Sequence, residues 1–378
     1  MTGVEQKIAV RLLRLCWATV ALLTLGACDK ISMGTSNRTI DIERTVFRPE
    51  ISGRITSFSR GHNGGFLLTG GVPSVFVWAA SVNADGSLMW RYPELSDPTR
   101  KNTDGMEFNG AAALEGGRTL ICGVRTSQEG IRENLILILD PQGMLLEERS
   151  EQASEARPVS SGFGACLPWG DGIAVTGSLS SGSRHSQWLV NLDKHGVKRW
   201  DKLLPPGASF QPIETADRGL VFSNYNDTPL RMEFVKVDVA GRLSASRKIE
   251  AVGYLVCPPV SPSNVIGLVS YGPKTVRYLL DDHLQDSIAP QSIPDVYTHE
   301  GFGFALPGGS LLLFGNVSGA AAVELGPSGQ IEATRVLPDV TGLAVGGVLP
   351  LSASEFVTAG IHDSSTSHDV VLNWLTLK

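Results

Sequence analysis

A short phrase returns along the whole chain: a glycine, four or five mostly apolar residues and a second glycine. Clear copies begin at Gly65, Gly117, Gly172 and Gly309, and weaker copies end at Ser223, Ser270 and Gly360. The closing positions of the seven copies are 70, 123, 177, 223, 270, 315 and 360. A nearly constant period in this range is typical of repeat architectures, in which each unit buries its apolar face against the next.

Each phrase is followed by an apolar strand pattern, a polar turn and another strand pattern. The turns read Asn/Asp/Gly-x-x-Gly and begin at Asn83, Asp140, Asp193, Asp238 and Gly326, and a degenerate turn spans Asp281–Leu284. An Asp or Asn side chain can accept hydrogen bonds within its own turn, and glycine adopts the left-handed conformation that a short hairpin needs. Strands of small residues, such as Gly110-Ala-Ala-Ala, precede the phrase. Four strands in about 48 residues are typical of propeller blades.

We therefore predict an all-β fold, a seven-bladed β-propeller of four-stranded blades, as a single domain over residues 38–378. No helical periodicity of useful length follows the first thirty residues. The last unit ends after the strand at 370–377 and lacks its fourth strand. Residues 42–49 resemble the outer strand at 331–338, so we expect this N-terminal strand to complete the last blade. Such closure removes exposed strand edges.

The first 28 residues carry the pattern of a secretory leader. Lys7, Arg11 and Arg14 precede or open an apolar run, which ends in Leu25-Gly26-Ala27-Cys28. A charged start, an apolar middle and a small-residue cleavage site are typical of a signal peptide. The alternative is a transmembrane anchor, but the stretch 17–27 is shorter than the roughly 20 residues of a span. We expect a signal peptide over 1–27 and a tether over 28–37.

The last four leader residues resemble a bacterial lipobox, which implies a lipid on Cys28. The protein would then be anchored to the cell envelope and face the periplasm. Asp29 is similar to the inner-membrane retention signal of enterobacterial lipoproteins, and both membranes remain alternatives.

Charge and cysteines restrict the function classes. The net charge is −6, and no basic stripe is present, which excludes nucleic acid as a partner because phosphate binding depends on Lys and Arg. Apart from Cys16 in the expected signal peptide and Cys28, the chain has three cysteines, Cys122, Cys166 and Cys257, which lie in apolar strand patterns. An odd number in an oxidising compartment leaves at least one free. A Cys122–Cys166 bridge between neighbouring blades is possible, and buried inert thiols are the favoured state.

Loop lengths distinguish two faces of the predicted ring. The connections between first and second strands and between third and fourth strands are short and share one face. The other face carries the long connections 93–107, 150–162 and 289–301 between blades, and 124–133, 178–186 and 361–369 within them. Long polar loops on a rigid scaffold commonly bind partners. The candidate partner-binding residues in these loops are Arg100, Lys101, Arg125, Arg132, Arg184, His185, Tyr297, His299 and His362.

The motifs of catalysis and metal binding are not matched. The serines of 177–182 and 315–319 lack the Gly-x-Ser-x-Gly spacing of a nucleophile elbow. His362 and His368 share a segment with Asp363 and Asp369, but their spacing on a serine-rich loop is weak evidence for zinc. Residues 281–286 lack the alternation of a calcium loop. We expect no catalytic residue, no metal and no cofactor.

The repeats are similar to a loose bacterial family of propeller repeats with the pattern Gly-Gly-h-h-h-h-Gly…Leu-Asp-x-x-Gly-x-h-h-h-Trp, where h is apolar. This resemblance covers residues 50–378 and implies the fold. Lipobox, tether and ring together resemble the general plan of BamB-type periplasmic propeller lipoproteins, although the blade motif differs and the predicted blade number is seven rather than eight.

The resemblance of plan implies a monomeric, non-catalytic binding module that docks a protein on the long-loop face. It would serve as an envelope assembly or secretion accessory, or as a toxin-neutralising immunity lipoprotein. The alternative is an envelope carbohydrate-binding protein or glycan-acting enzyme, which predicts aromatic platforms and paired carboxylates. A third hypothesis is a structural ring without a specific ligand.

Overall fold

The computed structural model describes most of residues 39–378. The gaps are 73–75, 95–104, 128, 154–159, 182–183, 205–207, 210–211, 228–229, 250–252, 258–265, 272–275, 293–301, 317–319, 329, 337–344 and 364–367. The chain divides into two compact units, residues 1–37 and 38–378. The predicted signal peptide, Cys28 and the tether lie outside the described residues. Within the described part, no helix has the length and apolar character needed to cross a membrane.

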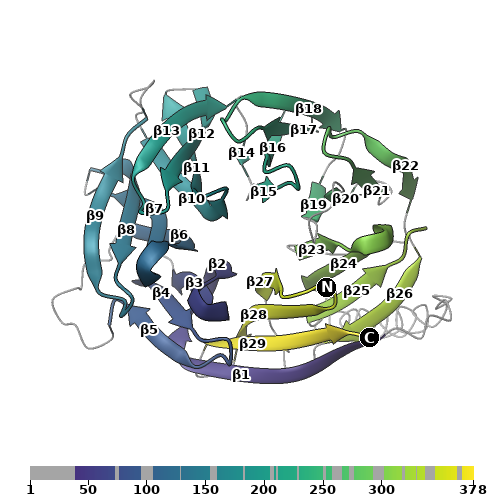
Figure 1. The fold of residues 1–378 in the computed structure, drawn as a ribbon, viewed down its shortest axis with the longest axis horizontal. Helices are drawn as coiled ribbons and strands as arrows, with labels where there is room; N and C mark the ends of the chain where they lie inside the picture. Colours follow the sequence, from purple (N-terminus) through teal and green to yellow (C-terminus); the bar gives the residue numbers. More distant parts are fainter. Residues whose placement is uncertain are drawn as a thin grey trace, which may run out of the picture. The chain divides into compact units, whose positions relative to one another are not determined.

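The described strands of the second unit form seven antiparallel sheets arranged around a ring (Figure 1). We number the sheets in chain order. Sheet 1 contains β2 (Arg54–Arg60), β3 (Phe66–Val72), β4 (Phe76–Val82) and β5 (Leu88–Tyr92). Sheet 2 contains β6 (Met106–Ala113), β7 (Thr119–Thr126), β8 (Arg132–Leu139) and β9 (Leu145–Glu151). Sheet 3 contains β10 (Ser160–Trp169), β11 (Gly172–Ser181), β12 (Arg184–Asp193) and β13 (Lys198–Leu204).

The second half of the ring continues the pattern. Sheet 4 contains β14 (Ala208–Ser209), β15 (Ile213–Glu214), β16 (Leu220–Asp227), β17 (Leu230–Val237) and β18 (Leu243–Ile249). Sheet 5 contains β19 (Gly253–Cys257), β20 (Ile266–Tyr271), β21 (Val276–Leu280) and β22 (Asp286–Ser292). Sheet 6 contains β23 (Phe302–Ala305), β24 (Leu311–Asn316), β25 (Ala320–Leu325) and β26 (Ile331–Val336). Sheet 7 contains β27 (Val345–Pro350), β28 (Glu355–Asp363), β29 (His368–Leu377) and β1 (Ile40–Ser52).

The all-β propeller of four-stranded blades is confirmed, but the prediction of seven such blades is wrong for one sheet. Six sheets have four strands, and sheet 4 has five because two short strands, β14 and β15, both pair with β16. Pro212 directly precedes β15. Since proline has no backbone N–H to donate to a ladder, it interrupts the inner strand at this point.

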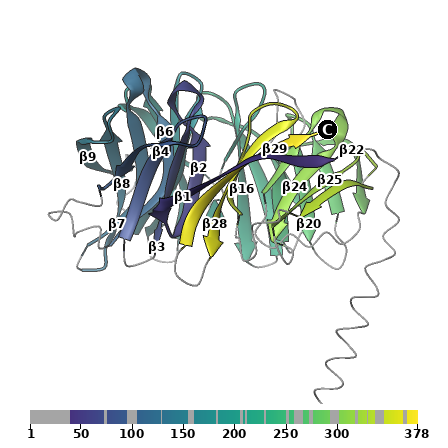
Figure 2. The same ribbon diagram turned by 90° about the horizontal axis from the view of Figure 1, so that it is seen from below.

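The N-terminal strand closes the ring, as predicted. β1 pairs antiparallel with β29, from Ile40 opposite Leu377 to Arg48 opposite Val370 (Figure 2). The chain then passes from β1 through Gly53 into β2, the inner strand of sheet 1. The last sheet therefore contains both ends of the second unit, and β1 covers the edge of β29.

Short turns connect the first two strands and the last two strands of most sheets. Three are single 3-10 turns, η2 (His62–Gly64), η3 (Glu115–Gly117) and η4 (Pro307–Gly309). In the third-to-fourth turns, one carboxylate oxygen of Asp140, Asp193, Asp238 or Asp281 accepts the N–H groups two and four residues ahead, at 2.8–2.9 Å. Leu284 takes the place of the turn glycine in sheet 5 with φ of 61°, so the degenerate turn keeps the same shape.

Seven buried apolar clusters join the sheets around the ring, one at each interface between consecutive sheets among the described residues. Second and third strands such as β7 and β8 are buried on both sides, so alternate residues serve two interfaces. On β7, for example, Leu120 and Cys122 face sheet 3, whereas Ile121 faces sheet 1. The cluster that joins sheets 7 and 1 contains Val370, Leu372, Phe66 and Trp78, and it completes the ring.

Long cationic side chains form a second kind of link between sheets. They reach from one sheet to the backbone carbonyls of the third-to-fourth turn in the next sheet. The donor and acceptor pairs are Arg44 to Ala84, Arg48 to Gly86, Arg149 to Gly196, Lys202 to Ala240, Lys236 to Asp282, Arg247 to Leu284, and Arg277 to Gly326 and Pro327. The turns of sheets 1, 3, 4, 5 and 6 therefore offer carbonyl groups to the preceding sheet.

Candidate protein-binding surfaces

The connections between second and third strands are hairpins rather than the long loops we predicted in three sheets. β7 and β8 leave only residues 127–131 between them, where Ser127 N donates to Ile131 O at 2.8 Å. In sheet 3, Ser181 pairs with Arg184, and in sheet 7, Asp363 pairs with His368. Backbone ladders need no apolar side chains, so these polar segments continue as strands. We call the tips of these three hairpins the hairpin face.

Two of the predicted arginines on the hairpin face form ion pairs within sheet 2. Arg125, on β7, pairs with Glu148 of β9, and Arg132, on β8, pairs with Glu107 of β6, with a nitrogen–oxygen distance of 2.8 Å in the second pair. Both pairs are solvent-accessible, with side-chain exposures between 32% and 55%. Exposed pairs of this kind contribute about 0–1 kcal/mol to folding. Their positive charge is compensated locally, which weakens the electrostatic attraction that we expected them to exert on a partner.

The other predicted residues are distributed as follows. Arg184 and His185 lie at the start of β12, opposite Ser181 and Ser180. His362, on β28, is half-buried and contacts the ring of Phe47, with centroids 5.6 Å apart. Arg100, Lys101, Tyr297 and His299 lie outside the described residues.

The histidine and aspartate cluster that the sequence contains near its end is part of the sheet 7 hairpin. His362 lies opposite Asp369, and Asp363 lies opposite His368. Over the described ranges, no three His, Cys, Asp or Glu side chains come together as a metal site would require.

A second surface, which we did not predict, runs along the outer strands. Eight of the nine large apolar side chains that are exposed among the described residues lie on fourth strands or their preceding turns, with exposures of 39–62%. We call this set the outer rim, and it consists of Phe47, Met89, Met144, Leu146, Val197, Val239, Leu243 and Ile288. The ninth, Ile131, lies in the hairpin of sheet 2. Methionine is enriched at protein interfaces, and the buried core of an interface is more apolar than its rim.

The signal for the outer rim is present in the sequence. Met144 and Val197 each follow directly after a turn glycine, where the strand points its side chain to solvent. An apolar residue at a position that the turn geometry exposes would have indicated this surface.

Charged groups flank the short-turn side of sheets 2 and 3. Lys194 donates to Glu115 at 2.8 Å, and this hydrogen bond is the main cause that lowers the pKa of Glu115. Arg199 forms a two-point contact with Asp171 and lowers the pKa of that carboxyl. Both carboxylates therefore remain charged at neutral pH. The Lys194–Glu115 pair joins sheet 3 to sheet 2, whereas the Arg199–Asp171 pair lies within sheet 3.

Tryptophan side chains of third and fourth strands pack onto the turns of the next sheet. A Cβ atom placed on Gly143 would lie 2.8 Å from the ring of Trp90, and one on Gly241 would lie 2.6 Å from the ring of Trp200. Trp374 contacts Gly86 in the same way, and Arg44 lies 3.7 Å from the centre of its ring. These aromatic rings hold sheets together, which is not the role that a carbohydrate platform requires.

Comparison with known proteins supports the fold. No family model and no curated protein matches the chain. The WD40 domain of Toxoplasma gondii coronin is similar, with 6% identity and a TM-score of 0.54 over 90% of this chain and 86% of that one. BBS1N in complex with ARL6DN matches with 10% identity and a TM-score of 0.49 over 90% and 97% of the two chains. A Dyadobacter fermentans protein of unknown function matches with 13% identity and a TM-score of 0.47 over 90% and 99%. The coronin similarity shows the β-propeller fold and no more.

Proposed function

We propose that this protein is a non-catalytic binding module, tethered to the bacterial envelope by a lipid on Cys28, that docks a protein partner from the periplasm. The lipobox-like residues 25–28 support the tether. The observation that carries the docking proposal is the outer rim, because it exposes apolar side chains on consecutive sheets of a rigid ring. Burial of such side chains is the main favourable contribution at the centre of a protein interface.

The outer rim is a better candidate for the docking surface than the hairpin face. Met144 and Leu146 lie next to each other on sheet 2, and Met89 and Val197 occupy the flanking sheets. A partner that covers these four residues removes apolar surface from water and gains about 25 cal/mol for each Å². On the hairpin face, Arg125 and Arg132 would first have to exchange their carboxylates for those of a partner.

The test is capture of envelope proteins by the lipidated protein and by surface variants. The double variant Met144→Lys, Leu146→Lys should bind the partner at least about 10-fold more weakly, which corresponds to about 1.4 kcal/mol. The matched control is Ile131→Lys, which places the same charge on an exposed apolar position of the hairpin face. It should bind as the native protein does.

Two results would contradict this proposal. If Ile131→Lys or charge reversal of Arg125 and Arg132 abolishes capture while the rim variant binds normally, the docking surface is the hairpin face. If no protein is captured and the ring is instead retained on peptidoglycan or polysaccharide, the function is carbohydrate binding.

A further inference from the structure

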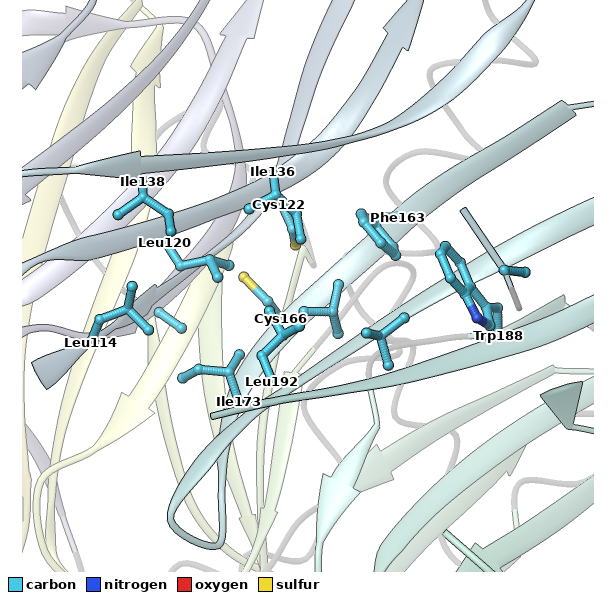
Figure 3. Packing of buried hydrophobic residues seen from close by; sticks show 14 of the residues in the cluster. Leu114, Leu120, Cys122, Ile136, Ile138, Phe163, Cys166, Ile173, Trp188 and Leu192 are labelled. Atoms are coloured by element: carbon cyan, nitrogen blue, oxygen red, sulfur yellow. The ribbon is translucent and has the colours of Figure 1, made fainter. Parts of the chain in front are cut away.

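Two cysteines meet at the interface between sheets 2 and 3. Cys122 lies on β7 and Cys166 on β10, and both are free and buried, with 0% and 3% of their surface exposed. They belong to one apolar cluster that also contains Leu114, Leu120 and Ile136 (Figure 3). In that view, the two sulfur atoms come from opposite sides of the interface and lie near each other.

Gly110 makes the space in which the two sulfurs lie. This glycine pairs with Cys122 across β6 and β7. A Cβ atom at Gly110 would lie 2.9 Å from Sγ of Cys122 and 3.0 Å from Sγ of Cys166. Both sulfurs are therefore close to the same point, which any other residue at position 110 would fill. Because position 110 has no side chain, the sulfurs of Cys122 and Cys166 border the same small space and are well placed to be joined.

We propose that Cys122 and Cys166 form a disulfide bond that covalently joins sheets 2 and 3, and that a small-molecule or protein disulfide donor forms it while the chain folds. One cysteine thiolate attacks a sulfur of the donor and releases the first donor thiolate, which gives a mixed disulfide. The other cysteine thiolate then attacks the cysteine sulfur of the mixed disulfide and releases the second donor thiolate. Two electrons pass from the cysteine pair to the donor, and the two cysteine protons are released.

The timing follows from burial. In the closed ring, the thiols are covered by apolar side chains, and burial followed by the hydrogen bond to Cys166 raises the pKa of the Cys122 thiol well above its ordinary value. The attacking species in exchange is the thiolate, which the folded protein disfavours and hides from the donor. The bond therefore forms before sheet 3 closes onto sheet 2, and the folded ring then preserves whichever redox state it received.

The experiment compares refolding with and without a disulfide donor. The full chain is denatured, reduced and refolded in glutathione disulfide or in dithiothreitol, then blocked with iodoacetamide and digested with trypsin. Refolding in glutathione disulfide should link the peptide 119–125, which contains Cys122, to the peptide 150–184, which contains Cys166. The linked protein should melt about 5 °C above the reduced protein, since the bond removes conformational freedom from the unfolded chain.

Variants and a native-state reaction complete the test. Cys122→Ala and Cys166→Ala should each refold, by circular dichroism, and melt at the same temperature with either reagent. Reduced native protein exposed to glutathione disulfide should form the link at least 100-fold more slowly than the refolding chain. The proposal is overturned if the refolded ring keeps both thiols free, if Cys257 is the partner instead, or if native protein is linked as fast as unfolded protein.

Discussion

Two interfaces of the ring join neighbouring sheets by different kinds of interaction. Between sheets 2 and 3, a large apolar cluster includes Phe163 stacked on Trp188, with ring centroids 5.1 Å apart. Between sheets 5 and 6, the cluster is small, and the buried Arg277 crosses to the carbonyls of Gly326 and Pro327. One interface relies on apolar volume and the other on directed hydrogen bonds from a charge.

Arg277 and a residue of the apolar cluster, Ile136, occupy the same position of the repeat. Arg277 lies four residues before Asp281, which opens the turn of sheet 5, and Ile136 lies four residues before Asp140 in sheet 2. Both side chains are buried, with exposures of 1% and 0%, and each faces the following sheet. The repeat thus specifies the direction of the side chain at this position, whereas the residue type differs between the two sheets.

Placing an arginine in the apolar interface between sheets 2 and 3 should have the largest effect on stability. Ile136→Arg buries a charge in the apolar cluster, where Arg149 already donates to Gly196 of the next turn. We expect a loss of more than about 4 kcal/mol in the free energy of unfolding, because the new charge is without a partner. Urea unfolding followed by circular dichroism measures it. Ile131→Arg, at an exposed position, should change stability by less than about 0.5 kcal/mol, and equal effects of the two variants would refute the comparison.

Removal of the buried charge between sheets 5 and 6 should have an intermediate effect on stability. Arg277→Met keeps much of the apolar stem but leaves the carbonyls of Gly326 and Pro327 without this donor. A loss of about 2 kcal/mol is expected, since the carbonyl of the buried Gly326 is costly to leave unsatisfied and the relief from burying a charge offsets part of the loss. Arg242→Met is the control, because Arg242 is 75% exposed in its pair with Asp238. Native stability of Arg277→Met would mean that apolar volume alone holds sheets 5 and 6 together.

The smallest effect concerns the pH dependence of a cationic link between sheets 4 and 5. Burial raises the pKa of Asp217, but hydrogen bonds from Lys236, Thr215 and Gly219 outweigh it and lower the pKa from 3.8 to about 2. Because the folded pKa lies below the unfolded one, the stabilisation is present above about pH 4 and is lost as the pH falls toward 2. Asp217 is 51% exposed, so solvent screening reduces the contribution to about 1 kcal/mol.

Urea unfolding of Asp217→Asn at several pH values tests this contribution. The variant should be less stable than the native protein by about 1 kcal/mol at pH 7 and equally stable near pH 2. A difference that stays constant from pH 7 to pH 2 would show that the carboxylate charge has no part in it.

The repeat predicts the strands better than it predicts their contacts. The apolar phrases coincide with second strands such as β3 and β24, and the strand expected at 42–49 closes the ring within β1. Residues 178–186 were expected to be a long, polar loop, but the ladder of β11 and β12 depends on backbone groups and continues to Ser181 and Arg184. The cationic links were not predicted, since their acceptors are backbone carbonyls, which every residue possesses.

The candidate surfaces show the same limit. Arg125 and Arg132 were selected because they lie in the expected loop 124–133, and their carboxylate partners, Glu148 and Glu107, come from other strands of the sheet. Only the register of the strands brings such pairs together. The position of Met144 on the outer rim could have been inferred from the turn glycine before it.

Closure of the ring by β1 sets an order of events during protein synthesis. Residues 40–48, which leave the ribosome early, find their partners only in residues 370–377, near the end of the chain. At a synthesis rate of roughly 5–20 residues per second, β29 is complete about 15–60 s after β1. During this interval, the backbone donors and acceptors of β1 lack their ladder and can join the edge of another nascent chain. The yield of folded protein therefore depends on how long translation takes and on whether β1 is kept from pairing with other chains during that time.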